Sequence, residues 1–351
     1  MDENPDHFAP GKTPHRRRPR YSGKYPRRFA EKYKEHDPAR YAETVAKVQA
    51  SGKTAAGTHR PVMLQEVLHV LSPKPGEIVV DSTLGFGGHA RELLSRIQPG
   101  GLLLGLDADP FELPKTMERL RAAGFGEAAF QAVRSNFAGL PKILASLNIE
   151  AVDAVFADLG VSSMQLDNPE RGFSFKFEGP LDMRMNPQRG ESASELIQKI
   201  SGEALANLLA ENADEPHSRL LAPALAGSRF ETTTALGKAI RDVLPCVTKE
   251  DQENSIRRIF QALRIAVNDE FGALNALLRA LPGVLKAGGR AVLLSFHSGE
   301  DRRVKKAFAA GLAAGLYCDI AHELVRPTAA ERHANPRSAP ARLRWAVRAD
   351  R

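Results

Sequence analysis

The segment from Ile78 to His89 constrains the fold more than any other part of this 351-residue chain. An apolar run of β-type residues ends on Asp81, the turn Gly85-Phe86-Gly87-Gly88 follows, and the residues after His89 have a helical pattern. A second apolar run ends on Asp107. A strand, a glycine turn and a helix start form a nucleotide-binding unit, and an acid at the next strand tip can accept hydrogen bonds from a ribose. The pattern predicts a site for an adenosine-containing cofactor.

The glycine spacing and a nearby acid indicate which cofactor fits this turn. A dinucleotide-binding turn has the pattern Gly-x-Gly-x-x-Gly and places a helix start against a pyrophosphate. Here Gly85-x-Gly87-Gly88 has no third glycine at the required spacing, and Asp81 precedes the turn. A carboxylate repels a pyrophosphate but attracts a ligand that carries an ammonium and a sulfonium. The pattern therefore favours S-adenosylmethionine over NAD. The competing interpretation is a glycine turn that serves only strand–helix packing, which Asp107 at the same sheet edge disfavours.

Apolar runs alternate with helical periodicities through the next part of the chain. A helix is expected over Leu64–Leu71. Strands are then expected over 78–82, 101–107, 128–134 and 152–158, with helices between them over 88–97, 110–123 and 138–147. This alternation predicts an α/β fold in which a parallel sheet has helices on both faces.

The alternation stops near residue 160. Residues 160–190 have the composition of loops, and residues 191–253 show only helical periodicity, in Ala193–Ile200, Glu203–Leu209, Ser218–Ala226 and Thr233–Leu244. A long amphipathic helix over 254–281 leads to expected strands over 290–296, 316–325 and 342–348. We therefore expect an α/β domain made of residues 58–165 and 254–351, with an all-helical insert over 166–253. A basic extension, residues 1–57, precedes it and is expected to be disordered apart from a short helix over Pro38–Ala50.

Composition and charge narrow the function classes. No apolar run approaches the ~20 residues of a membrane span, the polar N-terminus has no secretion signal, and Cys246 and Cys318 make no metal spacing. A cytoplasmic protein without a metal is expected. Residues 1–60 hold 14 Lys/Arg and 7 Asp/Glu, and residues 301–351 hold 11 and 5, so the basic charge lies at the two ends. Such ends suit a polyanionic partner such as RNA, although Arg16-Arg17-Arg18-Pro19-Arg20 is equally typical of a solvated tail.

A second chemical site follows the fourth expected strand. The apolar run 154–157 ends on Asp158, and the tight turn Leu159-Gly160-Val161-Ser162-Ser163 follows. In a doubly wound sheet the fourth strand lies beside the first, so its tip faces the same crevice. A carboxylate there can hold the hydrogens of a weakly nucleophilic exocyclic amine and orient it for in-line attack on a methyl group. The alternative is that Asp158 caps the following turn.

The longer motifs resemble those of a known family. They occur in order along residues 59–298: His59-Arg60-Pro61-Val62-Met63-Leu64, Gly85-Phe86-Gly87-Gly88-His89, Leu106-Asp107-Ala108-Asp109-Pro110, Asp158-Leu159-Gly160-Val161-Ser162-Ser163-Met164-Gln165-Leu166-Asp167, Arg171-Gly172-Phe173-Ser174-Phe175, Gly179-Pro180-Leu181-Asp182-Met183-Arg184-Met185, Phe260-Gln261-Ala262-Leu263-Arg264-Ile265 and Ser295-Phe296-His297-Ser298. The chain resembles the bacterial 16S ribosomal RNA cytosine-N4 methyltransferases over about residues 59–345. The resemblance implies a Rossmann-like class I methyltransferase sheet with a helical insert, S-adenosylmethionine as methyl donor, and a decoding-site cytosine of the small-subunit rRNA as target.

The resemblance also implies site residues. Seven positions of the family's cofactor site keep the expected residue type here: Gly87, Gly88, His89, Asp107, Phe137, Asp158 and Gln165. Backbone N–H groups at the first three can receive the methionyl carboxylate, Phe137 can pack on the adenine, and Gln165 can bond the cofactor or fix its loop. Contacts to the RNA substrate are expected from Arg171, Phe173, Arg184 and His297. The alternatives are that Phe173 lies in the core and that Arg184 forms a surface ion pair, and His297 is either a base at the crevice or a structural histidine.

The chain departs from the family pattern at four places. These are Ala213-Asp214-Glu215-Pro216-His217, Ser255-Ile256-Arg257-Arg258, Gly299 and Ala339-Pro340. None is a cofactor position, so they bear on RNA docking. Two other functions remain open on the sequence: methylation of an amine on another RNA or on DNA, and a non-catalytic RNA-binding scaffold with this fold. The sequence also leaves a homodimer open.

Overall fold

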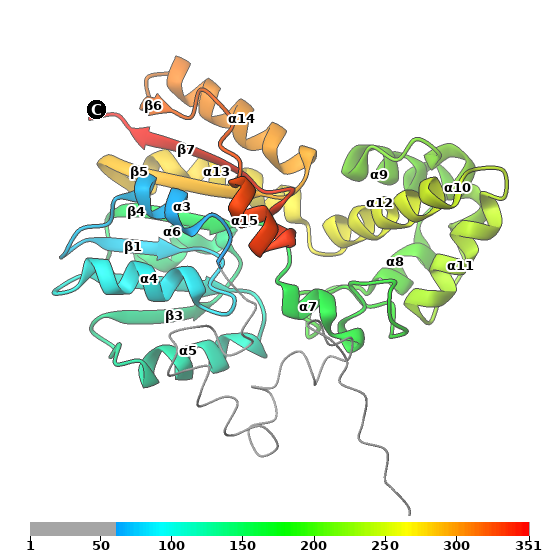
Figure 1. The fold of residues 1–351 in the computed structure, drawn as a ribbon, viewed down its shortest axis with the longest axis horizontal. Coiled ribbons are helices and arrows are strands. Elements are labelled where there is room, and N and C mark those ends of the chain that lie inside the picture. Colours follow the sequence, from blue (N-terminus) through cyan, green and yellow to red (C-terminus); the bar gives the residue numbers. More distant parts are fainter. Residues whose placement is uncertain (1–60, 351) are drawn as a thin grey trace, which may run out of the picture. The chain divides into compact units, whose positions relative to one another are not determined.

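The computed structural model describes residues 61–350 and contains a seven-stranded sheet. Its strands are β1 Ile78–Asp81, β2 Leu102–Asp107, β3 Phe130–Arg134, β4 Val152–Asp158, β5 Leu285–Ser295, β6 Tyr317–Ile320 and β7 Arg342–Arg348. The order is β3-β2-β1-β4-β5-β7-β6 (Figure 1). β7 runs antiparallel to β5 and to β6, and all other neighbouring strands are parallel. The α/β fold expected from the sequence is confirmed.

Side-chain alternation along the strands builds a core on each face of the sheet. Val79 and Leu103 pack with helices α3 (Leu64–Leu71), α4 (Gly88–Ile97) and α5 (Glu112–Ala122). Val80 and Leu104 point the other way and pack with α6 (Leu140–Ser146), α13 (Glu270–Val284) and α14 (Ser298–Ala313). Residues next to each other in a strand face opposite sides, so a continuous apolar run fits a sheet covered on both faces.

The strand order places the first two chemical motifs beside the third. β1 pairs with β2 on one edge and with β4 on the other. The chain therefore changes winding direction at β1, and in sheets of this kind ligands bind at the carboxyl ends of the strands next to that point. Asp81, Asp107 and Asp158 end these three strands, as the sequence predicted.

The helical insert has a hydrophobic core of its own. Its helices are α8 Ala193–Lys199, α9 Gly202–Ala213, α10 Ser218–Leu225 and α11 Thr233–Val243, close to the predicted ranges. Helix α12, Lys249–Val267, buries Ile256, Ile259 and Leu263 in the same core, so most of this helix packs with the insert.

One predicted helix is divided into two. The sequence predicted a single helix over 254–281, but α12 ends at Val267 and α13 starts at Glu270. Asp269 has a left-handed backbone (φ 46°), and the Asn268 side chain bonds the backbone of Met183 and Met185. Asn and Asp tolerate this conformation and bond the backbone readily, which ends a helix. Apolar periodicity continues across the break and therefore could not predict it.

Smaller differences concern short elements. The segment 160–190, predicted as loop, contains α7 (Ser163–Asp167) and the 3-10 turn η3 (Pro169–Arg171). The strand predicted over 316–325 ends at Ile320, and the sequence patterns did not predict α14 or α15 (Ala329–Ala334). The helix expected over Pro38–Ala50 lies outside the described residues. Within residues 61–350 there is no helix of sufficient length and apolarity to cross a membrane.

Candidate active site

The glycine turn brings the start of α4 to the sheet edge. Gly85 and Gly87 have positive φ angles of 48° and 82°, which glycine adopts without strain. A Cβ on Gly88 would lie 2.8 Å from Cγ of Pro61, so this glycine also lets the segment before α3 approach the turn. The first N–H groups of a helix have no carbonyl of that helix to bond. The start of α4 can therefore receive an anionic group such as a carboxylate.

Hydrogen bonds tie the three acidic strand tips to one another. The Asp107 carboxylate accepts the N–H of Gly85 (2.7 Å) and that of Asp109 (2.8 Å). The Thr83 hydroxyl accepts the N–H of Asp158 at 2.6 Å, and the Thr83 N–H donates to Asp81 at 3.1 Å. The glycine turn, β2 and β4 are thus held in a fixed relation at this edge of the sheet.

These acids make the crevice attractive to a cation. Burial, with the nearby charges of Asp81 and Glu300, raises the pKa of Asp158 to about 8. Burial raises the pKa of Asp81 to about 7 and that of Asp107 to about 6. Their ionised forms are poorly stabilised by the protein itself, so a positive ligand would stabilise all three. A ligand with a sulfonium and an ammonium fits this set, and a pyrophosphate does not.

The His89 side chain is buried at the start of α4. It is 7% exposed, and its ring lies 4.5 Å from that of Phe156. Nε2 is 3.0 Å from the carbonyl oxygen of Val62, and Nδ1 is 3.9 Å from Oδ2 of Asp158. Burial lowers the pKa of His89 to about 4, so the ring is neutral at physiological pH.

Gln165 and Arg171 meet at an acid that the sequence patterns did not single out. Gln165 completes the capping box of α7 and donates to Oδ2 of Asp109 at 2.9 Å. Arg171 donates to the same oxygen at 2.6 Å and to the carbonyl oxygens of Arg184 and Met185. Asp109 is only 2% exposed, so it is a buried anchor. In the sequence, the only indication of this anchor was the second acid of Asp107-Ala108-Asp109.

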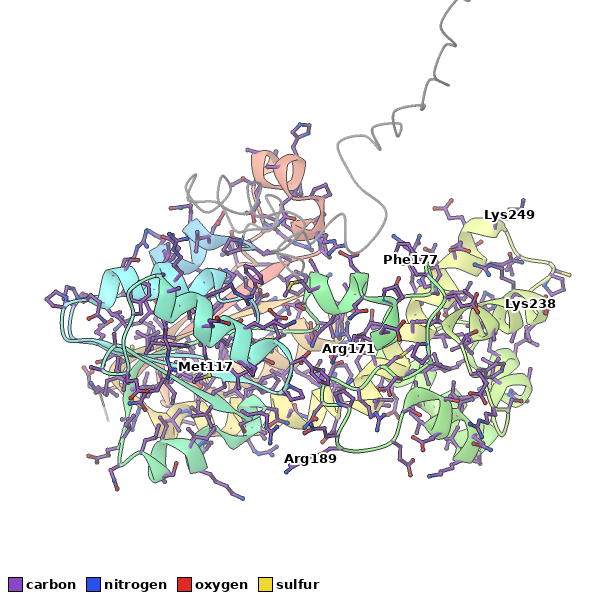
Figure 2. All side chains as sticks on the ribbon, turned by 90° about the horizontal axis from the view of Figure 1, so that it is seen from below. Met117, Arg171, Phe177, Arg189, Lys238 and Lys249 are labelled. Carbon is purple, nitrogen blue, oxygen red and sulfur yellow. The ribbon has the colours of Figure 1, made fainter. Side chains whose placement is uncertain are left out.

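Two of the residues that were expected to contact RNA make contacts within the protein. Arg171 was predicted to bind RNA, but its guanidinium bonds groups of the protein and lies between the sheet domain and the insert (Figure 2). Phe173 was predicted to stack on a base, but it is 5% exposed and packs in the insert core. An aromatic ring is favoured in a core for the same apolarity that suits stacking, so the sequence could not separate the two roles.

The remaining predicted site residues are Arg184, Phe137 and His297. Arg184 forms a forked pair with Asp182, at 2.9 and 2.6 Å. Phe137 starts the turn η2 (Phe137–Gly139) after β3 and is partly buried against the core. His297 follows β5, and its Nε2 lies 3.3 Å from Oε1 of Glu300.

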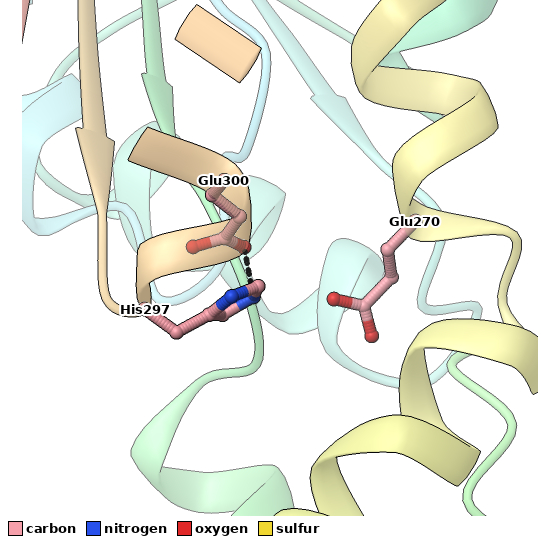
Figure 3. A group of neighbouring side chains, drawn as sticks. All are labelled: Glu270, His297 and Glu300. Atoms are coloured by element: carbon pink, nitrogen blue, oxygen red, sulfur yellow. Dashed lines mark ion pairs between the residues drawn. The ribbon is translucent and has the colours of Figure 1, made fainter. Parts of the chain in front are cut away.

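Figure 3 shows the His297 ring next to Glu300, with Glu270 on its other side. These three side chains could supply metal ligands, since one atom from each lies within 4.8 Å of the others. However, both Glu270 oxygens accept from Arg264, at 2.8 and 2.9 Å. Burial opposes ionisation of Glu300, but the bond from His297 and the charge of Arg264 lower its pKa. The guanidinium balances the cluster, which we interpret as an ion-pair network that gives His297 a structural partner.

Comparison with known proteins identifies the family. A model described as the MraW methylase family matches residues 56–349, nearly the whole region that carries the site. The chain belongs to the MraW methylase family. The chain is 46% identical to "Ribosomal RNA small subunit methyltransferase H 1" of Agathobacter rectalis, over 96% of this chain and 98% of the relative. It is 47% identical to "Ribosomal RNA small subunit methyltransferase H 2" of Alkaliphilus metalliredigens, over 95% and 98%.

The relatives differ in how much of the basic extension they match. The Agathobacter alignment leaves out 4% of this MraW-family chain, about 14 residues, which is fewer than the 57 of the extension. "Ribosomal RNA small subunit methyltransferase H" of an Anaeromyxobacter species covers 82% of this chain yet 96% of its own length, at 43% identity. The Agathobacter relative thus aligns with most of the extension, whereas the Anaeromyxobacter relative matches a smaller share of this chain.

Proposed function

We propose that this chain transfers the methyl group of S-adenosylmethionine to N4 of a cytosine in 16S rRNA of the small ribosomal subunit. The observation that carries the proposal is the placement of Asp81, Asp107 and Asp158 at the carboxyl ends of three neighbouring strands beside the glycine turn, in a member of a methylase family. The closely similar relatives are named for methylation of small-subunit rRNA. The same crevice supports S-adenosylmethionine by charge, as the raised pKa values of the three acids indicate.

We assign the cofactor contacts as follows. The N–H groups of Gly87, Gly88 and His89 hold the methionyl carboxylate, since an anion is stabilised at a helix start. Asp107 accepts the ribose hydroxyls and Phe137 packs on the adenine. Gln165 holds the rim of the crevice through Asp109. When bound, S-adenosylmethionine supplies an electrophilic methyl carbon, and its sulfur leaves as a neutral thioether.

Asp158 is the residue that we assign to the cytosine amine. The lone pair of an exocyclic amine is delocalised into the base, so the nitrogen is a poor nucleophile. An acceptor that holds its hydrogens favours the pyramidal, attacking form and fixes its direction. Asp158 ends β4 next to the crevice, and its Oδ1 has no hydrogen-bond partner among the described residues. A target base has to leave its stack to reach this depth.

The choice of rRNA as substrate is supported by the distribution of charge and by the helical insert. The basic charge at the chain ends suits rRNA, and the helical insert offers a second surface next to the crevice. Arg171 and Phe173 are more deeply buried than Arg184, which is paired with Asp182 but keeps 22% of its side chain exposed, so we expect RNA contacts from Arg184 and from other groups of the insert. We place the enzyme in the cytoplasm with its substrate. The described residues offer no support for a homodimer.

Tritiated methyl transfer tests the proposal directly. Small subunits and free 16S rRNA from a strain that lacks the enzyme are incubated with the full-length protein and labelled S-adenosylmethionine. Label is then assigned to a nucleoside by digestion and mass spectrometry. The proposal predicts N4-methylcytidine at a single site. Label in another nucleoside would redirect the enzyme to another amine, and cofactor binding without any transfer would favour a non-catalytic scaffold.

A further inference from the structure

We propose that the His89 imidazole is a positioning residue for methyl transfer, whose Nδ1 accepts a hydrogen bond from Asp158 when that carboxyl holds the proton released by the amine. The inference rests on the proposed function and adds a role for the His89 side chain, beyond the backbone contact assigned above. It also gives a role to the segment Pro61-Val62, which the cofactor site does not use.

The Val62 carbonyl fixes which ring nitrogen of His89 carries the hydrogen. A carbonyl oxygen can only accept, and Nε2 lies 3.0 Å from it, so Nε2 must be the donor. A neutral imidazole has one N–H, and therefore Nδ1 has a free lone pair. Gly88 makes this arrangement possible, because a Cβ there would lie 2.8 Å from Pro61 and displace the segment that supplies the carbonyl.

The ring environment keeps His89 neutral. The side chain is buried against Phe156, at 4.5 Å between ring centroids, and has no exposed face that water could stabilise. Burial lowers its pKa to about 4. His89 is therefore an acceptor toward Asp158 over the physiological range and does not form an ion pair with it.

The two facing atoms are complementary in only one protonation state of Asp158. Nδ1 of His89 and Oδ2 of Asp158 are 3.9 Å apart, and both are acceptors while Asp158 is ionised. Once Oδ2 carries a proton, the pair becomes a donor and an acceptor, and a small side-chain movement brings it to hydrogen-bond distance. Asp81 and Glu300, the charged groups that act on Asp158, are both acidic and oppose its ionised form, whereas Thr83 bonds only its backbone. His89 is thus the neutral acceptor next to this carboxyl.

The site can accept the proton that the reaction releases. The cytosine amine carries two protons and gains a methyl group, so its nitrogen becomes positive and has to lose one proton. The Asp158 carboxylate, whose ionised form a cationic ligand favours, takes that proton and becomes a neutral acid. Its O–H donates to Nδ1 of His89, which keeps its own charge and tautomer. The proton passes to solvent after the product leaves, and the carboxylate is restored.

The first test reads the tautomer without substrate or cofactor. Protein labelled with ¹⁵N-histidine is titrated from pH 6 to 9 by NMR, with the His89 ring assigned through the backbone of Gly88 and Ala90. We expect a neutral Nε2–H tautomer throughout, and a shift of the Nδ1 signal as Asp158 gains its proton. A Nδ1–H tautomer, or a ring that titrates near its ordinary pKa, would overturn the inference.

The second test uses a matched pair of variants. His89→Asn places an amide oxygen near the position of Nδ1, whereas His89→Gln retains a donor near Nε2 but no acceptor at Nδ1. We expect His89→Gln to lower the single-turnover rate about 10- to 100-fold, the range for groups that orient a reacting side chain. Its pH–rate profile should shift, and His89→Asn should recover part of both effects. Cofactor affinity, measured by calorimetry, should change by less than about threefold in both variants.

The outcomes separate this inference from the proposed function. If the wild-type protein transfers no methyl group to rRNA, the proposed function fails, and the NMR titration still tests the His89 geometry. If the wild-type protein is active and His89→Gln has the same rate and pH profile, the inference alone is wrong. If His89→Gln does not fold, the titration of the wild-type protein decides.

Discussion

Asp158 is a partly buried carboxyl with a raised pKa, and its Oδ1 has no hydrogen-bond partner among the described residues, which a structural role does not explain. We expect Asp158→Asn to reduce the single-turnover rate at least about 100-fold, since the amide cannot take the amine proton. The variant should fold and, above pH 8, unfold at a higher temperature than the wild type, because a disfavoured charge is removed. Asp153→Asn is the matched control on the same strand: it loses a pair with Lys286 and should keep transfer within about twofold. Near-normal turnover of Asp158→Asn would exclude the proposed role.

The pH dependence of stability follows from the same acids. Burial raises the pKa values of Asp107, Asp81 and Asp158 from 3.8 to about 6, 7 and 8, so the folded protein holds protons that the unfolded chain releases. Their stabilisation is complete below pH 4 and is lost as the pH rises through 6 to 8. His89, with its pKa lowered to about 4, opposes this trend only between pH 4 and 6.5.

We therefore expect the unfolding temperature of the ligand-free protein to fall between pH 6.5 and 8 and to level off above 8. Scanning calorimetry across this range measures it, and Asp158→Asn should flatten the decrease. A saturating amount of S-adenosylmethionine should restore stability most at pH 8, because the cation favours the ionised acids. A midpoint that rises over this interval would contradict the assigned environment.

At the residue scale, the sequence predicted the strand-tip acids and the glycine turn because both depend on local order along the chain. The contact between Asp109 and Arg171 was not predicted, because it joins residues that are 62 positions apart. Phe173 and Arg171 were assigned to RNA on residue type alone. Residue type does not reveal burial, and burial decides between a core contact and a ligand contact for both.

At the scale of elements, Arg171 connects β2 with the chain that enters the insert. We expect Arg171→Ala to lower the free energy of unfolding by about 3–5 kcal/mol, because it removes the cation that compensates the buried Asp109 charge and leaves only hydrogen bonds such as that from Gln165. Urea unfolding followed by circular dichroism measures the loss. The Asp109→Asn, Arg171→Ala double variant should recover part of it. If the single variant is as stable as the wild type, Arg171 is free to contact RNA, as the sequence first indicated.

Most elements could be predicted within a few residues, and the exceptions share a cause. The strands β1 to β4 and the helices between them have alternating or 3.6-residue apolar patterns that depend only on neighbouring residues. The division of the helix at Asn268 depends on the backbone of Met183 and Met185, more than 80 residues away. The joint between the two parts of the fold is set by such long-range bonds, and local patterns do not contain them.

At the scale of the whole molecule, the basic residues are concentrated away from the acidic strand ends at which we place the reaction. The carboxyl ends of β1, β2 and β4 carry acids, which suit a cationic cofactor but oppose the approach of RNA phosphates. The chain carries a net charge of +7, and its basic residues are concentrated toward the ends. The RNA backbone therefore has to be attracted by parts of the molecule outside the crevice, while the target base alone enters it.

The basic extension, residues 1–57, is one part of the chain that can attract the RNA backbone, and its contribution can be measured. We expect a variant that starts at residue 58 to keep its single-turnover rate at saturating rRNA and to bind rRNA more weakly. The logarithm of its affinity should also fall less steeply with the logarithm of salt concentration, because fewer phosphate contacts are lost. A full-length variant with Arg16, Arg17, Arg18 and Arg20 replaced by Gln separates charge from chain length. Equal affinity and equal salt dependence for all three proteins would mean that the extension is a solvated tail, and the cations of residues 301–351 would then have to supply the attraction.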